Sequence, residues 1–290
     1  MKIKKAVIPV AGLGTRFLPY TKVVPKEMLP VWDIPIIQFI IEEAINSGIE
    51  SVLFVTSKEK YSIEDYFDRN FYLEYFLNKN KDKEKLSVLN RIPQNFRIYS
   101  VRQKEARGLG DAILHAEDFI AEEFFAVFLP DDLIFSQKPV MKQMIEVMEN
   151  YNKPVLGVEK VPWKMVNSYG IIKPRKIKKR IFEILDMIEK PDIKDAFSNL
   201  GVVGRYILPG NIFSFIKKTK PGVKGEIQIT DSLRILMKEQ GILAYEFEGI
   251  RCDTGNKYDY LLAILTYASM HKELRKKIKR DIKKIFKINL

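Results

Sequence analysis

Residues 5–35 read KAVIPVAGLGTRFLPYTKVVPKEMLPVWDIP, and this stretch decides the fold. Ala6 to Val10 is a short apolar run that predicts a buried strand, and Gly12 and Gly14 interrupt it at once. Glycine leaves room for another group to approach the backbone. A proline-rich loop, which we expect to be extended rather than helical, follows and carries three cations: Arg16, Lys22 and Lys26. Free N–H groups and positive charge at such a turn suit the triphosphate of a nucleotide.

Two better-known glycine loops do not fit this stretch. The dinucleotide fingerprint requires a third glycine where Phe17 stands, and the Walker loop requires a Gly-Lys-Ser/Thr sequence that is not found here. A lone GLG could also be a tight turn beside solvated lysines. The longer run GLGTRFLPYTKVVPKEMLP, however, closely resembles the opening of bacterial UTP–glucose-1-phosphate uridylyltransferases. The resemblance implies nucleotide binding by Ala11, Gly12, Gly14, Arg16 and Lys26, and catalytic roles for Arg16 and Lys26.

The composition is that of a globular protein. The chain has 290 residues, of which 46% are hydrophobic and 30% charged. A single cysteine, Cys252, excludes an internal disulfide and suits a reducing cytoplasm. No apolar run approaches the roughly 20 residues of a membrane span, and the basic start lacks the apolar stretch of a signal peptide. We therefore expect a cytoplasmic protein without a membrane partner.

The net charge of +12 is concentrated in the tail. Residues 272–287 hold nine basic and two acidic residues, so this segment carries +7. Its apolar residues share one helical face, which predicts a basic amphipathic C-terminal helix over 272–290. These residues are Leu274, Ile278, Ile282, Ile285 and Phe286. The helix could pack on its own domain or contact a second copy; a nucleic-acid-binding protein that uses this tail is a more distant alternative.

The apolar pattern predicts an α/β fold. A strand over 6–10, a helix over 37–45 and a strand over 51–56 form a βαβ unit, and hence a parallel sheet. We expect a helix over 62–77 with its aromatic residues on the buried side, and a charged, mobile loop over 78–87. Further strands are expected over 96–101, 124–129, 155–158, 202–208 and 242–248, and further helices over 109–119, 141–148, 211–217, 229–239 and 258–270.

An antiparallel excursion interrupts this alternation. NSYGIIKPRKIKKRIFEILDMIEKP, residues 167–191, predicts two strands joined by a basic turn. The prediction for the whole chain is a doubly wound, mostly parallel sheet, similar to that of the nucleotide-diphospho-sugar transferases. It carries a small antiparallel insertion at about 163–200. We assign residues 1–271 to one nucleotidyltransferase domain and residues 272–290 to the terminal helix.

Two aspartate motifs are candidates for a metal site. Asp131 and Asp132 directly follow an apolar strand, where ligands of parallel sheets bind. Carboxylates there are natural ligands for Mg²⁺ beside substrate phosphates, although a turn or capping pair fits the spacing equally well. LPDD and DTGNK resemble the uridylyltransferase motifs whose aspartates coordinate the metal. The resemblance implies Mg²⁺ binding by Asp131 and Asp253 and leaves the role of Asp132 open.

Two further motif pairs are assigned to the base and the sugar. A glutamine can donate and accept at once, as reading a uracil edge requires, although a solvated loop glutamine is the alternative for Gln103. In the similar enzymes the glutamine of VRQ and the first glycine of GLG hold the base, which implies these roles for Gln103 and Gly108. YGII and EKP resemble the sugar-1-phosphate site, which implies sugar-phosphate binding by Gly170, Glu189 and Lys190 and a catalytic role for Lys190.

The sequence shows no set of residues for nucleophilic catalysis, and phosphoryl transfer between two phosphates does not need one. The two histidines, His115 and His271, fall in predicted helices, and no Ser–His–Asp or Cys–His set is evident. A phosphate nucleophile with a second pKa of ~6 is largely dianionic at neutral pH and requires no general base. We predict transfer of uridylyl from UTP to glucose 1-phosphate, giving UDP-glucose and pyrophosphate, by a homo-oligomer (dimer or tetramer) that does not bind nucleic acid. A related enzyme using dTTP is the nearer alternative, disfavoured by the KEMLP and GEIQITD motifs.

Overall fold

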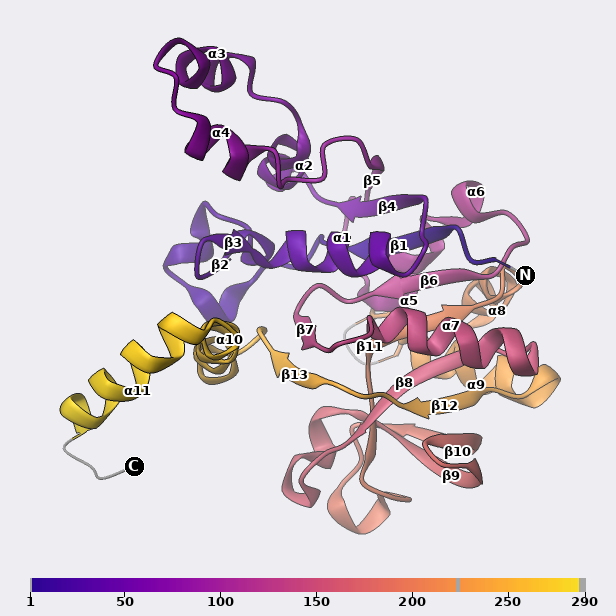
Figure 1. Ribbon diagram of the computed structural model, residues 1–290. Helices are drawn as coiled ribbons and strands as arrows, with labels where there is room; N and C mark the ends of the chain where they lie inside the picture. Colours follow the sequence, from indigo (N-terminus) through magenta and orange to yellow (C-terminus); the bar gives the residue numbers. More distant parts are fainter. Residues whose placement is uncertain (1, 223–224, 287–290) are drawn as a thin grey trace.

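A nine-stranded sheet forms the centre of the protein (Figure 1). The computed structural model describes residues 2–222 and 225–286. The strand order is β5-β4-β1-β6-β11-β8-β12-β10-β9. The pairings place seven of these strands in one direction, with only β10 and β11 of this sheet running against them. The predicted α/β fold with a mostly parallel sheet is confirmed.

The first half of the sheet is the predicted parallel unit. β1 (Lys5–Pro9) lies between β4 (Ser51–Thr56) and β6 (Phe125–Phe128), and β4 pairs with β5 (Arg97–Arg102), all in parallel. Successive side chains of a strand point to opposite faces, so β1 contributes to hydrophobic clusters on both sides of the sheet. Helices on both faces bury β4 and β6, as their nearly continuous apolar sequences require, whereas β5 at the edge of the sheet is largely exposed.

The second half contains the antiparallel pairings. β11 (Leu200–Leu208) lies between β6 and β8 (Val155–Lys160), and β12 (Leu243–Glu246) follows β8 in parallel. β9 (Gly170–Lys178) and β10 (Ile181–Glu189) form the predicted hairpin. β10 pairs with β12, and β9 touches β11, so the hairpin belongs to the edge of the main sheet.

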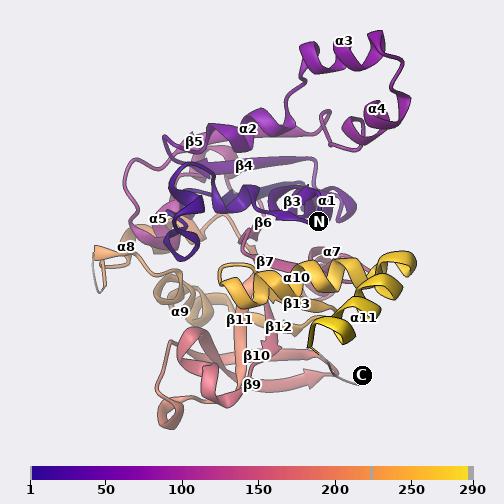
Figure 2. The same cartoon turned by 90° about the vertical axis from the view of Figure 1, so that its left-hand side faces the viewer.

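Helices cover both faces of the sheet (Figures 1 and 2). α1 (Ile36–Asn46) and α7 (Val140–Tyr151) pack their apolar residues on one face. α5 (Gly108–Leu114), α8 (Ile212–Lys218) and α9 (Ile229–Gln240) pack on the other. The expected single helix over 109–119 is divided, because α5 ends at Leu114 and a short α6 (Glu117–Ile120) follows.

The segment after β4 departs from the prediction. The expected helix over 62–77 is two helices, α2 (Tyr61–Phe67) and α3 (Phe71–Lys79), because the Asn70 side chain accepts a hydrogen bond from the Leu73 N–H and starts a new helix. The expected loop over 78–87 contains α4 (Lys83–Leu89), which Asp82 caps in the same way. The aromatic residues of α3 are exposed rather than buried, because the α3–α4 pair stands away from the sheet (Figure 1).

Two other regions contain more structure than expected. The proline-rich loop forms three short 3₁₀ turns, Thr15–Phe17, Tyr20–Lys22 and Lys26–Met28, rather than a purely extended path. The small antiparallel pair β2 (Pro30–Val31) and β3 (Ile34–Pro35) closes this loop before α1. Pro19 and Pro25 directly precede two of these turns. A proline is favourable at the start of a turn, which explains why the prolines did not keep the whole loop extended.

The chain ends in two consecutive helices, α10 (Lys257–Met270) and α11 (Lys272–Phe286). The predicted amphipathic helix is confirmed over residues 272–286; residues 287–290 and the side chain of Phe286 lie outside the described structure. Of the helices in the described ranges, none combines the length and apolar character that a membrane crossing requires.

Candidate active site

The loop after β1 delivers Lys26 to the carboxylate of Asp131. The 3₁₀ turn that begins at Lys26 follows Pro25, and the Lys26 Nζ atom lies 2.7 Å from Asp131 Oδ2. Burial alone would lower the pKa of Lys26, but the negative charges of Asp131 and Glu27 raise it overall. Burial likewise opposes the ionisation of Asp131, yet the charge and hydrogen bond of Lys26 hold the Asp131 pKa below its usual value. Both groups are therefore charged at neutral pH.

A two-stranded ladder brings Asp253 to the same place. β7 (Asp132–Phe135) pairs antiparallel with β13 (Ile250–Asp253), and Asp253 is the cross-strand partner of Asp132. The next residue, Thr254, donates its backbone N–H and its hydroxyl to the Asp131 carbonyl at 2.7 and 2.9 Å. These bonds fix the turn after β13 against the turn before β7. The sequence reading did not include this ladder.

Gly255 marks the point where the two carboxylates and an arginine meet. A β-carbon added there would stand 2.8 Å from Asp253 Oδ1, and 3.4 Å from both Asp131 Oδ2 and Arg16 Nη1. Arg16 Nη1 also lies 3.4 Å from the Gly255 carbonyl, as its only hydrogen-bond acceptor among the described residues. The structure thus brings together three predicted site residues that are widely separated in the chain, Arg16, Asp131 and Asp253.

Asp131 and Asp253 have the donor chemistry of a magnesium site. Mg²⁺ prefers oxygen ligands and commonly takes one or two protein carboxylates, with water and substrate phosphates completing its shell. Two carboxylates that approach the same glycine fit this description. No group of three or more potential metal-ligating residues (His, Cys, Asp or Glu) occurs in the described part of the chain, so a site here would depend on oxygens from the substrate.

The hairpin provides a second polar group. Glu189 ends β10, and its Oε2 accepts a hydrogen bond of 2.7 Å from the Thr230 hydroxyl at the start of α9. A β-carbon on Gly170, at the start of β9, would stand 3.1 Å from the same oxygen, so this position is tight for any larger residue. Lys190 Nζ lies 3.5 Å from Glu189 Oε1, and Lys190 remains mostly exposed. Gly170, Glu189 and Lys190 therefore lie together, as predicted.

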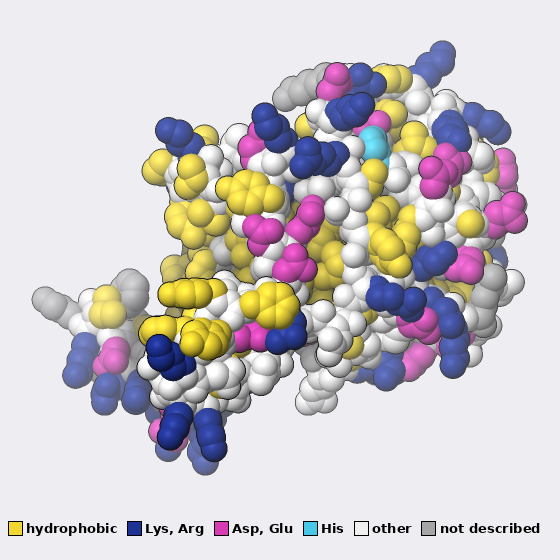
Figure 3. Space-filling model, turned by 90° about the horizontal axis from the view of Figure 1, so that it is seen from above, with side chains coloured by type: hydrophobic (Ala, Val, Ile, Leu, Met, Phe, Trp, Pro, Cys, Tyr) yellow, Lys and Arg dark blue, Asp and Glu magenta, His cyan; other side chains and the backbone are white. Residues whose placement is uncertain are grey.

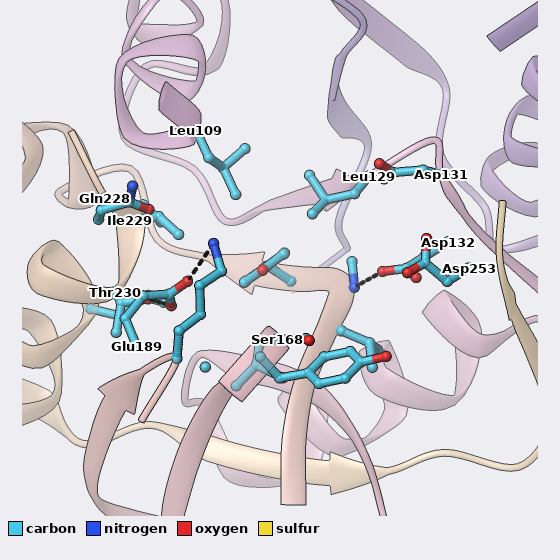
Figure 4. A pocket seen from close by; sticks show the side chains of 18 of the residues that line it. Leu109, Leu129, Asp131, Asp132, Ser168, Glu189, Gln228, Ile229, Thr230 and Asp253 are labelled. Atoms are coloured by element: carbon cyan, nitrogen blue, oxygen red, sulfur yellow. Dashed lines mark hydrogen bonds and ion pairs between the residues drawn. The ribbon is translucent and has the colours of Figure 1, made fainter. Parts of the chain in front are cut away.

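One cavity of about 320 Å³ connects the two groups. Figure 4 shows Glu189 and Thr230 at one end and Asp131, Asp132 and Asp253 at the other. The walls between them come from β11 and the start of α9. Six predicted site residues line this cavity: Arg16, Asp131, Gly170, Glu189, Lys190 and Asp253.

The remaining predicted residues lie outside this cavity. Lys26 reaches it only through its contact with Asp131, while Ala11, Gly12 and Gly14 belong to the turn behind Lys26. A β-carbon on Gly12 would stand 3.7 Å from Lys26 Cε, and Gly14 adopts a φ of 65° that favours glycine. This turn therefore packs closely on the lysine, whatever it binds.

Gln103 and Gly108 are both associated with α5, and neither lines the cavity. The Gln103 amide is buried and donates a 2.7 Å hydrogen bond to Asp111 Oδ2 on α5. Gly108 begins α5 with a φ of 91°, and a β-carbon there would meet the Ile227 carbonyl at 2.9 Å. The neighbouring Leu109 does line the cavity. The structure therefore leaves the base-binding assignment of these two residues as a prediction.

Several cavity residues were missed by the sequence reading. Thr230 is the threonine of GEIQITD, a motif that was used only to distinguish between related enzymes. Arg251 stands two positions before Asp253, the aspartate of DTGNK, and Tyr169 directly precedes Gly170. All three are neighbours of motif residues, so attention to residues flanking each motif could have found them.

Comparisons with known proteins identify the family to which the chain belongs. The sequence model of the family described as nucleotidyl transferase matches residues 5–270. A UTP–glucose-1-phosphate uridylyltransferase of Streptococcus pyogenes serotype M3 is 44% identical over 286 residues, which cover 97% of this chain and 95% of that protein. A second uridylyltransferase of Streptococcus pyogenes is 43% identical over 291 residues, covering 99% and 95%.

Solved structures give the same answer. A UDP-glucose pyrophosphorylase complexed with UDP-glucose superposes with a TM-score of 0.85 at 43% identity, covering 93% of this chain and 100% of the other. A UTP-bound enzyme of this type from Acinetobacter baumannii superposes with a TM-score of 0.89 at 40% identity, covering 97% and 99%. The family model and the relatives span nearly the whole chain, and the protein belongs to the nucleotidyl transferase family, within it to the bacterial UTP–glucose-1-phosphate uridylyltransferases.

Proposed function

We propose that the protein transfers the uridylyl group of UTP to glucose 1-phosphate, giving UDP-glucose and pyrophosphate. The observation that carries this proposal is the single cavity with Asp131 and Asp253 at one end and Glu189 with Lys190 at the other. A nucleotide and a sugar phosphate placed at the two ends would meet in the middle. The relatives that bind UTP and UDP-glucose are similar over nearly the full length of the chain and support the choice of substrates.

In the proposed reaction an oxygen of the glucose 1-phosphate phosphate attacks the α-phosphorus of UTP in line. A new P–O bond forms, the bond to the β-phosphate breaks, and pyrophosphate leaves with the electron pair. The phosphate nucleophile is already ionised, so alignment and charge neutralisation are sufficient. Arg16 and Lys26 would bind the UTP phosphates, and Lys190 would bind the sugar phosphate, with Gly170 and Glu189 at the sugar hydroxyls.

The proposed cofactor is Mg²⁺, held by Asp131 and Asp253. When bound, the ion would neutralise charge on the phosphates that enter the site. The fixed cations supply the rest of the neutralisation. Lys26 stays protonated at neutral pH because its pKa is raised by the neighbouring carboxylates, and arginine is charged at any physiological pH.

A pyrophosphate-release assay with glucose 1-phosphate and each of UTP, dTTP, CTP and ATP tests this function. We expect UTP to be the preferred nucleotide. Turnover with dTTP that equals or exceeds turnover with UTP would overturn the uridylyl assignment and favour the thymidylyl alternative. Replacing glucose 1-phosphate with other sugar 1-phosphates in the same assay then tests the sugar.

We also propose that the protein is a homo-oligomer. It exposes 16,376 Å², whereas a compact monomer of 33.8 kDa is expected to expose about 12,700 Å². Part of the excess lies on the arm formed by α3 and α4, where four aromatic side chains are at least half exposed: Phe71, Tyr72, Tyr75 and Phe76. Figure 3 looks down on this arm and shows hydrophobic side chains gathered over it. Such patches are typical of protein contacts.

The α3 surface is a better candidate for self-contact than the tail. α3 contains one acidic and one basic residue, so two copies would not repel each other there, whereas the tail carries +7. Light scattering of a Tyr72→Ser/Tyr75→Ser variant should give a lower mass than the wild type, with the exposed Tyr258→Ser as a matched control. A chain truncated after His271 tests the tail in the same experiment. If the wild type itself has the mass of one chain, the oligomer proposal is wrong.

The proposed location is the cytoplasm. The support for it is the one cysteine, Cys252, which is buried and unpaired and suits a reducing compartment. Cell fractionation with an antibody against the protein would test the location directly.

A further inference from the structure

Arg251 is a buried cation in the middle of the cavity wall. Its side chain is 8% exposed, and it projects from β13 two residues before Asp253. Its Nε donates to Asp132 Oδ1 at 2.5 Å and its Nη1 donates to Glu159 Oε1 at 2.6 Å. A buried arginine is tolerated only when carboxylates surround it, and here two carboxylates from β7 and β8 do so.

The same guanidinium reaches the sugar end of the cavity. Arg251 Nη1 donates to the Tyr169 hydroxyl at 3.2 Å, and the guanidinium carbon lies 5.2 Å from the centroid of the Tyr169 ring. Tyr169 is the residue before Gly170, and its carbonyl accepts a 3.0 Å hydrogen bond from the Lys190 N–H. The position of Tyr169 therefore governs both Gly170 and Lys190.

On the other side, Asp132 connects Arg251 to the metal-binding candidates. The second oxygen of Asp132 accepts a 2.6 Å hydrogen bond from the Gly204 N–H, so both Asp132 oxygens are engaged. Asp132 is also adjacent to Asp131 and is the cross-strand partner of Asp253. The Asp132 carboxylate therefore has a structural role, which the sequence left open: it joins β7 to Gly204 and to Arg251.

Most of the donors of Arg251 are occupied in this arrangement. Nε and Nη1 serve Asp132, Glu159 and Tyr169, and Nη2 also lies 2.5 Å from Asp132 Oδ1. A guanidinium engaged in this way is poorly placed to grip a substrate phosphate bidentately. Its geometry suits a rigid bridge between the two ends of the cavity.

We propose that Arg251 is a positioning residue that sets the separation between the sugar-phosphate end and the carboxylate end through Tyr169. This inference rests on the proposed uridylyl transfer, in which the two substrates approach from these ends. Reaction rates respond strongly to such alignment, because a misplacement of about 1 Å can cost about a hundredfold. Tyr169 directly precedes Gly170, and its carbonyl accepts a hydrogen bond from the Lys190 N–H. Because these two residues are assigned to the sugar phosphate, the bridge acts on glucose 1-phosphate more than on UTP.

Two variants test the bridge. Tyr169→Phe removes only the hydroxyl that accepts from Arg251 and keeps the ring. Arg251→Lys keeps the charge but replaces the planar guanidinium, whose separate nitrogens reach different partners, with a single compact ammonium. We expect Tyr169→Phe to raise the KM for glucose 1-phosphate about fivefold, and Arg251→Lys about tenfold or more, with the KM for UTP nearly unchanged. The double variant should show less than the product of the two effects. Arg175→Lys, which alters an exposed ion pair with Glu183 on the same hairpin, is the matched control.

Two independent readouts separate the possible outcomes. Thermal unfolding identifies a variant that fails to fold, and Tyr169→Phe keeps the test decisive should Arg251→Lys do so. Calorimetric titration with UDP-glucose measures binding without turnover and should weaken in parallel with the KM for glucose 1-phosphate. Equal changes in both KM values, or effects that multiply in the double variant, would overturn the bridge. A wild type that turns over no sugar phosphate would instead remove the proposed function, and the bridge with it.

Discussion

Gly255→Ala tests the proposed meeting point of Arg16, Asp131 and Asp253 directly. The added methyl carbon would stand 2.8 Å from Asp253 Oδ1. To regain an ordinary contact of about 3.5 Å, that oxygen has to move by roughly 0.7 Å. The other two contacts are 3.4 Å and can nearly be kept, so Asp253 absorbs most of the change. Gly255 does not have a positive φ, and alanine therefore introduces no backbone strain.

The expected result is a loss of activity with little loss of stability. A displacement of this size at the proposed metal ligand should lower kcat by about tenfold to a hundredfold, and raise the Mg²⁺ concentration needed for half-maximal rate. Steady-state kinetics with varied Mg²⁺ measure both, and a thermal unfolding scan measures stability. Gly222→Ala is the control, because the nearest heavy atom among the residues that the structure describes, the Glu226 carbonyl oxygen, would lie 3.7 Å from the new carbon. An unchanged Mg²⁺ requirement in a folded Gly255→Ala enzyme would refute the reasoning.

Three further predictions follow from the charged groups. Asp253→Asn should raise the Mg²⁺ concentration for half-maximal rate, and full activity at limiting Mg²⁺ would remove Asp253 from the metal site. Lys26→Ala and Lys190→Ala should each remove a charge-assisted contact of about 1.5–3 kcal/mol, or roughly ten- to a hundredfold. Lys190→Ala should leave the Mg²⁺ requirement nearly unchanged, whereas Lys26→Ala should also alter it, because Lys26 Nζ lies 2.7 Å from Asp131 Oδ2. Kinetics with each substrate varied should show Lys26→Ala acting on UTP and Lys190→Ala on glucose 1-phosphate, and the reverse pattern contradicts the assignment. Lys60→Met should destabilise the fold by about 3–5 kcal/mol in denaturant titration, because it leaves the Glu27 carboxylate, 2.8 Å from Lys60 Nζ, buried without its cation.

The Glu27 carboxylate also gives that last variant a pH dependence. Burial raises the pKa of Glu27, although Lys60 opposes the shift. A carboxyl whose pKa is raised in the folded state binds its proton more tightly there than in the unfolded state. Its contribution to the free energy of unfolding is therefore fully present below the pKa of the unfolded state, and it is lost as pH rises through the pKa of the folded state. Without the cation the shift should be larger. The stability lost in Lys60→Met should therefore grow between about pH 4 and pH 7, and a loss independent of pH would contradict this interpretation.

Local sequence was sufficient where one pattern carried the whole signal. The strand over 6–10 was predicted because it is a continuous apolar run, which faces a core on both sides of the sheet. The helix over 37–45 was predicted because its apolar residues share one helical face. The hairpin over 167–191 was predicted as two strands joined by a basic turn. In each case neighbouring residues alone specify the element.

Elements that depend on distant residues were missed. β7 and β13 contain only four residues each, and Asp132 and Arg251 in them are polar, so no apolar alternation marks either as a strand. Their pairing is stabilised across more than a hundred residues by the ion pair between Arg251 and Asp132. The exposed aromatic face of α3 misled the sequence reading for a related reason, because apolar spacing predicts a buried face without showing what covers it.

The site was predicted better than its geometry. The motif resemblance named six residues that line one cavity, although they are spread from Arg16 to Asp253. It could not show that Lys26 reaches the cavity through Asp131, nor that Gln103 turns its amide toward Asp111. Those facts depend on the packing of loops against one another, which no single motif contains.

The contact between Arg16 and Gly255, 239 residues apart in the chain, has a consequence for the order in which the protein is made and becomes active. Domains emerge from the ribosome with the N-terminal part first, at about 5–20 residues per second. The parallel strands near the start can pair long before Asp253 is synthesised, but the carboxylate pair is completed only when β13 joins β7. A prematurely terminated product that ends within the sheet could retain much of its core and still lack one of the two carboxylates. If the two carboxylates act together as proposed, a chain that ends before Asp253 would fold part of the sheet without being able to consume nucleotide.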